Sequence, residues 1–141
     1  MNLMRIGLTA MMTAVLSMGI ACAQEPVDPQ PAKPLTYVHP SYHKVTPYVA
    51  KKMMEEGVVL IDVREPDEFA EGHVKGAVNV PMSVLKPGMK LKAVPNFEDK
   101  VLVQCKSGVR AENASKILIE TGYKNVYNAY GTSQWKYGLV K

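Results

Sequence analysis

The chain has 141 residues, which is enough for one ordinary domain with a hydrophobic core and too few for two. Its formal net charge of +4 is mild, and its Lys and Arg residues do not gather into the basic face of a nucleic-acid binder. We therefore expect a single site and no nucleic-acid partner. The charge balance fits either a preference for small anions or a surface that is merely soluble.

Residues 1–23 are typical of a secretory signal peptide. Arg5 supplies the charged start, an apolar run covers residues 6–20, and small residues at 21–23 form the cleavage pattern. The apolar run is shorter than the roughly 20 residues that a membrane-spanning helix needs. We therefore expect a periplasmic (secreted) protein with no stable membrane insertion after cleavage. Lipoprotein anchoring through Cys22 is a minor alternative, because Gly19 stands where such signals have a large aliphatic residue.

Residues 24–41 carry half of the ten prolines and little periodic apolar content, which predicts a proline-rich tether. The folded domain is then expected over residues 42–141. If Cys22 leaves with the signal peptide, Cys105 is the only cysteine of the mature chain. An intramolecular disulfide is then excluded, and the domain depends on its core alone.

The domain begins with the pattern of a helix followed by a buried strand. Thr46 is a good N-cap, Pro47 suits the first helical position, and Gly57 can end the helix. Apolar residues share one face of this segment and charged residues the other, as in an amphipathic helix. Residues 58–63 then form a continuous apolar run, which is typical of a strand covered on both faces in a parallel sheet.

Helices and strands continue to alternate along the rest of the chain. The expected elements are a short helix, a strand, a connection rich in Pro and Gly, a buried strand, a helix that ends at Gly122 and a last strand, over residues 66–71, 77–80, 81–95, 101–104, 111–122 and 125–128. This alternation predicts an α/β fold with a parallel sheet and helices on both of its faces. Ligand sites in such sheets form at the carboxyl ends of the strands.

Cys105 stands where one of the buried strands ends, a few residues before the next helix. Gly108 permits the positive φ that lets backbone N–H groups converge on the sulfur. Those amides, the helix N-terminus and the cations Lys106 and Arg110 favour a thiolate, hence a nucleophile. No histidine base adjoins it in sequence, although His73 could lie nearby in space. A buried, inert cysteine is the alternative, and the Gly108 and Arg110 that follow argue against it.

The loop from Cys105 to Arg110 resembles the six-residue active loop of the rhodanese family, with Lys106, Ser107, Gly108 and Val109 between its ends. Residues 59–69 and 72–81 resemble two hallmark segments of that family. Gly131 and Trp135 are similar to its closing segment, with Tyr130-Gly131 in place of the usual paired glycines. Four matches in the right order cover the chain from about Tyr42 to its end.

The resemblance implies a three-layer α/β/α rhodanese-like fold with a central parallel sheet, and the activity of a thiosulfate sulfurtransferase. Cys105 would take the outer sulfur of thiosulfate as a persulfide and pass it to cyanide or a thiol, without a metal or other cofactor. The loop amides would stabilise the persulfide, while Lys106 and Arg110 would draw in the anionic donor. Asp62, Arg64 and His73 fall in the hallmark segments, and we interpret them mainly as scaffold.

Two other functions stay open from the sequence. Phosphatases and arsenate reductases of the same fold separate the cysteine and arginine by five residues, whereas four intervene here, which suits a single sulfur better than a tetrahedral oxyanion. A tethered module that binds a partner without turnover is the second alternative. His39 and His43 invite a metal site, but Pro40 between them disfavours a helix that would place both on one face, so we interpret both as surface residues.

Overall fold

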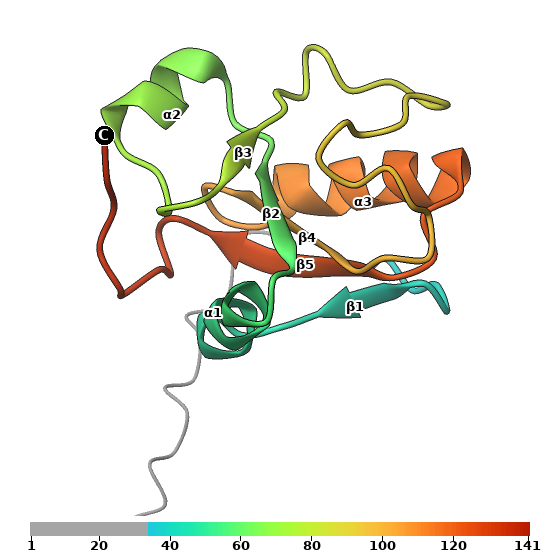
Figure 1. Ribbon diagram of the computed structural model, residues 1–141, viewed down its shortest axis with the longest axis horizontal. Helices are drawn as coiled ribbons and strands as arrows, with labels where there is room; N and C mark the ends of the chain where they lie inside the picture. The colour runs from blue at the N-terminus through green and yellow to red at the C-terminus, as the bar shows by residue number, and fades with distance from the viewer. Residues whose placement is uncertain (1–33) are drawn as a thin grey trace, which may run out of the picture.

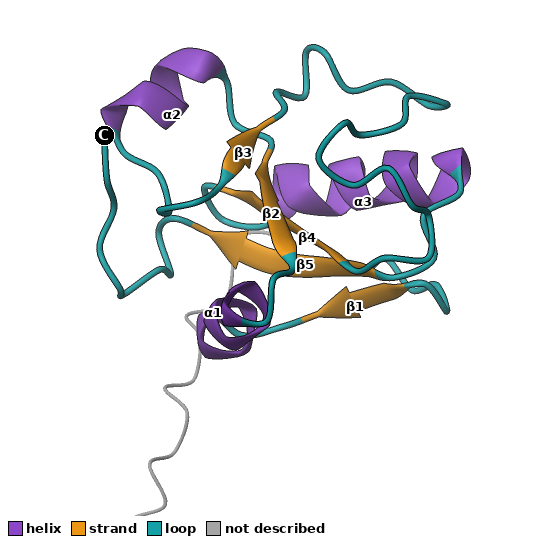
Figure 2. Cartoon of the chain, in the orientation of Figure 1, coloured by secondary structure: helices purple, strands orange, loops and turns teal. Residues whose placement is uncertain are grey.

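The computed structural model describes residues 34–141, so the predicted signal peptide, Cys22 and most of the predicted tether lie outside the described residues. Figures 1 and 2 show strands and helices alternating along the described chain. The elements are β1 (Tyr42–Lys44), α1 (Pro47–Glu55), β2 (Val59–Asp62), α2 (Pro66–Glu71), β3 (Val78–Asn79), β4 (Val101–Cys105), α3 (Val109–Thr121) and β5 (Val126–Gly131). Across residues 34–141, no helix is long and apolar enough to cross a membrane.

The five strands form one sheet in the order β1-β5-β4-β2-β3, and every pair is parallel. The residues of β4 alternate between two cores: Val103 packs in the core that includes α3, whereas Leu102 packs in the core that includes α1. Figure 1 shows the two helices on opposite faces of the sheet. The predicted three-layer α/β/α fold is therefore confirmed.

The helix termini follow the capping residues that the sequence predicted. The side chain of Thr46 accepts a hydrogen bond from the Val49 N–H at 3.2 Å, and Pro47 is the first residue of α1. At the other end of the domain, α3 stops before Gly122, whose φ of 128° favours glycine. These local signals place both helices within a few residues of their predicted bounds.

Strand bounds differ more from the predictions. The strand β1 was not predicted, because it has three residues of which only Tyr42 is buried, too few for a periodic pattern. The strand β5 continues to Gly131 instead of ending at residue 128, because it pairs with β4 past an irregularity as far as Cys105. The predicted strand 77–80 is reduced to the two residues of β3 at the sheet edge.

The long connection between β3 and β4 contains no regular element, yet it is part of the core. Leu85, Leu91 and Val94 are buried in the cluster that includes α3. The hydroxyl of Tyr123 donates to the Val94 carbonyl at 2.6 Å and accepts the Leu91 N–H at 2.8 Å. These bonds satisfy buried backbone groups that no strand pairs.

Candidate active site

The loop from Cys105 to Arg110, called the active loop below, joins the end of β4 to the start of α3. Gly108 is the N-cap of α3 and has a φ of 110°, as its place in the sequence predicted. Its N–H donates a hydrogen bond to the Cys105 sulfur at 3.0 Å. The turn therefore aims a main-chain donor at the sulfur, and convergence of further loop amides on it stays a prediction.

Cys105 is only 1% exposed and packs against the core that contains α3. Its sulfur nevertheless lies at the amino end of α3, where the helix dipole favours negative charge. Because water is largely excluded there, a nearby N–H or charge acts on the sulfur more strongly than it would in solvent. The burial also means that a reactant has to be small to reach the sulfur.

Arg110 is held by a carboxylate that the sequence did not single out. Its two terminal nitrogens lie 2.7 and 2.9 Å from the two carboxylate oxygens of Glu68. The hydrogen bonds from Arg110 lower the pKa of Glu68 to about 2, and the same contact raises the pKa of Arg110. Arg110 was expected to draw in an anionic donor, but the structure shows it engaged in a bidentate ion pair.

Glu68 also belongs to the first turn of α2. Its carboxylate accepts the Glu65 N–H at 2.9 Å, and together the two residues form a capping box. The carboxylate of Glu65 in turn accepts the Ser83 hydroxyl at 2.8 Å. An acid three residues after a helix N-cap was a visible signal in the sequence, but its second partner, Arg110, lies 42 positions away.

Lys106 is the cation of the active loop that remains exposed and forms no ion pair within residues 34–141. It lines a hollow of about 250 Å³ whose other lining residues are Arg64, Glu68, Glu71, Gly72, Thr132 and Leu139. This hollow lies at the carboxyl ends of the strands, where parallel sheets place their ligands. A small anion that enters it meets Lys106 beside the loop that holds the sulfur.

Arg64 and Asp62 form a buried brace beneath this hollow. The guanidinium of Arg64 lies 2.7 Å from the Asp62 carboxylate and donates to the carbonyls of Gly72 and Glu68 at 2.8 and 3.3 Å. His73 stacks on the ring of Phe69, with centroids 3.8 Å apart, and its Nδ1 lies 2.8 Å from the Phe69 carbonyl. These contacts agree with the interpretation of the three residues as scaffold.

The turn after β5 packs directly against the active loop. The Thr132 and Ser133 N–H groups donate to the carbonyls of Cys105 and Lys106 at 2.9 and 3.0 Å. A Cβ on Gly131 would overlap the Lys106 carbonyl and the following amide nitrogen, so this position requires glycine. The turn therefore acts as a clamp on the loop, which the sequence indicated only through its resemblance to a closing segment.

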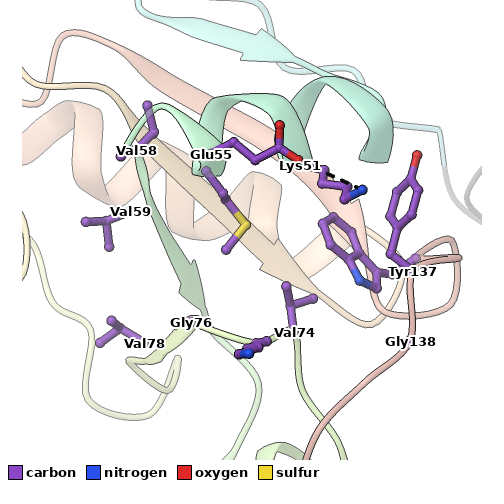
Figure 3. A pocket seen from close by; sticks show the side chains of 13 residues that line it. Lys51, Glu55, Val58, Val59, Val74, Gly76, Val78, Tyr137 and Gly138 are labelled. Atoms are coloured by element: carbon purple, nitrogen blue, oxygen red, sulfur yellow. Dashed lines mark ion pairs between the residues drawn. The ribbon is translucent and has the colours of Figure 1, made fainter.

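A larger hollow of about 630 Å³ lies beside α1 and includes no residue of the active loop. Figure 3 shows Val58, Val74 and Val78 around it, with Tyr137 near the ion pair of Lys51 and Glu55. It is mostly apolar, and its lining contains no cysteine, serine or histidine.

His39 and His43, at the predicted domain edge, have different contact partners. The Nδ1 of His39 accepts the Ser41 N–H at 3.0 Å, and His43 stacks on Tyr127. No group of three or more metal-ligating side chains occurs within the described part of the chain.

These features define a class of protein: a parallel α/β/α fold with a cysteine at the carboxyl end of a central strand, inside a loop that caps a helix. A model of the rhodanese-like domain matches residues 46–137. The chain therefore belongs to the rhodanese-like domain family.

Its relatives carry names from one enzyme class. The chain is 33% identical over 91 residues to the thiosulfate sulfurtransferase GlpE of Haemophilus influenzae, covering 64% of this chain and 84% of that protein. It is 42% identical over 71 residues to the thiosulfate sulfurtransferase PspE of Escherichia coli, covering 50% and 67%. A Schizosaccharomyces pombe protein with the name "Putative thiosulfate sulfurtransferase, mitochondrial" is 42% identical over 88 residues, and the match spans 62% of that protein and 55% of this chain.

Solved structures agree with the fold. A structure described as "rhodanese with anions from E. coli" is 38% identical, with a TM-score of 0.55 and coverage of 60% of this chain and 99% of that one. The human single-domain sulfurtransferase TSTD1, at 24% identity, shares the fold with a TM-score of 0.56 over 70% of this chain and 95% of its own. The expectation of an enzyme of the sulfurtransferase class is thus confirmed at the level of the family, while the roles of single residues stay predictions.

Proposed function

We propose that this protein is a thiosulfate sulfurtransferase that moves a sulfane sulfur from thiosulfate, or a related anionic donor, to cyanide or a thiol through a Cys105 persulfide. The observation that carries the proposal is the hydrogen bond of 3.0 Å from the Gly108 N–H to the Cys105 sulfur, at the end of β4 and the start of α3. The sulfurtransferase relatives support the same reaction class.

In the first half-reaction, the Cys105 thiolate attacks the outer sulfur of thiosulfate. A new S–S bond forms at Cys105, the original S–S bond of thiosulfate breaks, and its electron pair leaves with sulfite. In the second half-reaction, cyanide or a thiolate attacks the outer sulfur of the persulfide. The bond to Cys105 breaks and returns its electron pair to the cysteine, so the product is thiocyanate or a persulfide of the acceptor.

The loop favours the charged states of both half-reactions. The Gly108 N–H and the amino end of α3 face the Cys105 sulfur, so they stabilise its negative charge before sulfur uptake. After uptake the negative charge lies on the outer sulfur of the persulfide, where the helix dipole favours it as well. Lys106 lines the adjacent hollow and is the cation available to attract thiosulfate. The ion pair of Arg110 with Glu68 holds the first turn of α3 in place, so we assign Arg110 an anchoring role as well as a share in the local field.

The acceptor has to come from outside the chain. Cys105 is the free cysteine of the described residues, and within them it has no second thiol beside it. A persulfide formed there therefore cannot be resolved into a disulfide with another described residue. With a secretory signal, the small acceptor would be met in the periplasm, which is our proposal for the location.

Intact mass spectrometry of the full-length chain tests the proposal. After incubation with thiosulfate we expect a gain of one sulfur atom, mapped to Cys105 by peptide analysis and removed by cyanide with formation of thiocyanate. Cys105→Ser should show no gain, while Cys22→Ser is the matched control and should behave as the parent chain does.

The alternatives give different results. No sulfur gain in a chain whose Cys105 accepts an alkylating reagent would refute the proposal and favour the binding module. Hydrolysis of an aryl phosphate in place of sulfur transfer would favour the phosphatase class. Full thiosulfate:cyanide transfer by Cys105→Ser would show that the sulfur does not pass through Cys105.

A further inference from the structure

Asn128 is a fully buried polar residue in the middle of β5, and every hydrogen-bonding group of its side chain has a partner. Its amide nitrogen donates to the Gly108 carbonyl and to the Tyr42 hydroxyl, each at 3.0 Å. Its side-chain oxygen accepts the Tyr130 N–H at 2.8 Å. A primary amide has two N–H donors, so both are used, and three separate segments meet at this one side chain.

The bond to the Gly108 carbonyl bears on the sulfur. Gly108 donates its N–H to Cys105 on one side and presents its carbonyl to Asn128 on the other. The same carbonyl accepts the Glu112 N–H at 2.9 Å as the first hydrogen bond of α3. Because glycine restrains its own backbone angles less than any other residue, the orientation of Gly108 depends on outside contacts, and the bond from Asn128 restrains the peptide plane that follows the N–H.

The bond to Tyr130 explains an unusual backbone. Tyr130 has a φ of 60°, the left-handed region that residues with a side chain rarely adopt. Its Cα lies 3.3 Å from where a Cβ on Gly108 would be, so this backbone passes directly over the loop glycine. Asn128 holds the Tyr130 N–H in that conformation, and such strain persists where the surrounding structure imposes it.

Stability alone does not account for an asparagine at this position. A buried amide gains little over an apolar side chain, because its hydrogen bonds replace bonds to water. Its neighbours in β5 that are equally buried, Val126 and Ala129, are apolar. An apolar residue could make none of the three side-chain hydrogen bonds, and the bond to the Gly108 carbonyl is the one that reaches the active loop.

We infer that Asn128 is a positioning residue for sulfur transfer: its side chain orients Gly108 so that the Gly108 N–H faces the Cys105 sulfur. This inference rests on the proposed function, since it assigns Asn128 a part in that reaction. The side chain acts through Gly108 and touches neither the sulfur nor the donor. Loss of Asn128 should therefore slow the attack on thiosulfate more than it weakens thiosulfate binding at Lys106.

The test compares single-turnover sulfur uptake in three full-length variants, each first shown to be folded at the assay temperature by its thermal unfolding curve. Asn128→Ala removes all three bonds, whereas Asn128→Asp keeps the shape and the acceptor for the Tyr130 N–H but loses the donors. Asn125→Ala is the matched control, because it removes one asparagine bond to a backbone carbonyl, that of Glu98 at 2.7 Å, just before β5 begins and away from the active loop.

We expect the maximal uptake rate to fall about 10- to 100-fold in both Asn128 variants, since misplacement of a loop group by about 1 Å can cost about 100-fold in rate. The thiosulfate concentration at half-maximal rate should stay within about twofold, and Asn125→Ala should match the parent chain. In ¹H–¹⁵N spectra the Gly108 amide resonance should shift in the Asn128 variants only.

Parent-like uptake rates in a folded Asn128→Ala or Asn128→Asp chain would overturn the inference. An equal loss in Asn125→Ala would also overturn it, because the effect would then be one of general destabilisation. If Asn128→Ala does not fold, Asn128→Asp decides. If the parent chain itself takes up no sulfur, the proposed function fails, and the Gly108 resonance still decides whether Asn128 sets the loop: an unchanged resonance refutes it.

Discussion

The ion pair between Glu68 and Arg110 allows a quantitative prediction for Glu68→Gln. This substitution keeps the shape of the side chain and removes its charge. A pKa lowered from its ordinary 4.5 to about 2 corresponds to about 3 kcal/mol in favour of the charged form. Because the side chains of Arg110 and Glu68 are 35% and 33% exposed, solvent screening reduces this to about 1–2 kcal/mol. We expect Glu68→Gln to lower the free energy of unfolding at pH 7 by that amount.

The contribution of Glu68 to the free energy of unfolding should change with pH in a definite direction. The pKa of Glu68 is lower in the folded state than in the unfolded state, so its contribution is fully present above about pH 4.5 and is lost as the pH falls through about 2. The difference in unfolding free energy between the parent chain and Glu68→Gln should therefore be constant from pH 5 to pH 8 on this pKa argument. It should shrink steadily below that range.

Urea denaturation followed by circular dichroism at a series of pH values measures this difference. Glu98→Gln is the control, because Glu98 forms an ion pair of similar length with Lys124, 2.7 Å, but both side chains are 64% exposed. We expect no measurable loss there. A Glu68→Gln chain as stable as the parent at pH 7, or a difference that persists undiminished near pH 2, would refute the reasoning.

Three further substitutions test the loop and its surroundings. Gly131→Ala should destabilise the fold by about 2 kcal/mol or more in urea denaturation, because its Cβ would overlap the Lys106 carbonyl; Gly72→Ala, whose Cβ would meet Leu139 at an ordinary 3.5 Å, should cost much less. Lys106→Ala should raise the KM for thiosulfate about three- to tenfold and flatten its dependence on ionic strength in steady-state assays. Burial raises the pKa of Tyr42 to about 12, so the contribution of its protonated hydroxyl to stability is present below about pH 10 and is lost as the pH rises through about 12. In thermal unfolding, Tyr42→Phe should therefore lose less stability than the parent chain between these two pH values.

The layers of the fold were predictable because they depend on patterns within single segments. The continuous apolar run around β2 and the run in β4 each indicated a strand covered on both faces, and both strands lie inside the sheet. Thr46 and Gly122 set the ends of two helices through contacts with their own neighbours in sequence. The strand β1 was not predicted, because its three residues form a strand by pairing with β5, a distant segment, and not through a pattern of their own.

The residues that carry the chemistry could be predicted from the sequence, whereas the residues that hold them in place could not. Cys105, Gly108 and the start of α3 lie within a few residues of one another, so a single short stretch of sequence contains the nucleophile, the turn and the helix N-terminus. The partners that hold this stretch in place come from elsewhere: Glu68 from α2 and Asn128 from β5. Neither has a local signal for its role, since an acid in a first helical turn and an asparagine within a strand can each occur without any link to an active site.

Tyr130 shows that contacts from other residues have to be known before a departure from the family pattern can be interpreted. A tyrosine in place of the first of two paired glycines suggests, by itself, a position where the backbone has no need of glycine. The structure shows the opposite: Tyr130 keeps a left-handed φ of 60°, and the Asn128 side chain holds its N–H. Tyr130 therefore adopts, without being glycine, a backbone conformation that favours glycine, at a cost in strain of about 1–2 kcal/mol. The fold accepts this cost because the path is fixed from both sides, by Asn128 beneath the turn and by the close contact with Gly108.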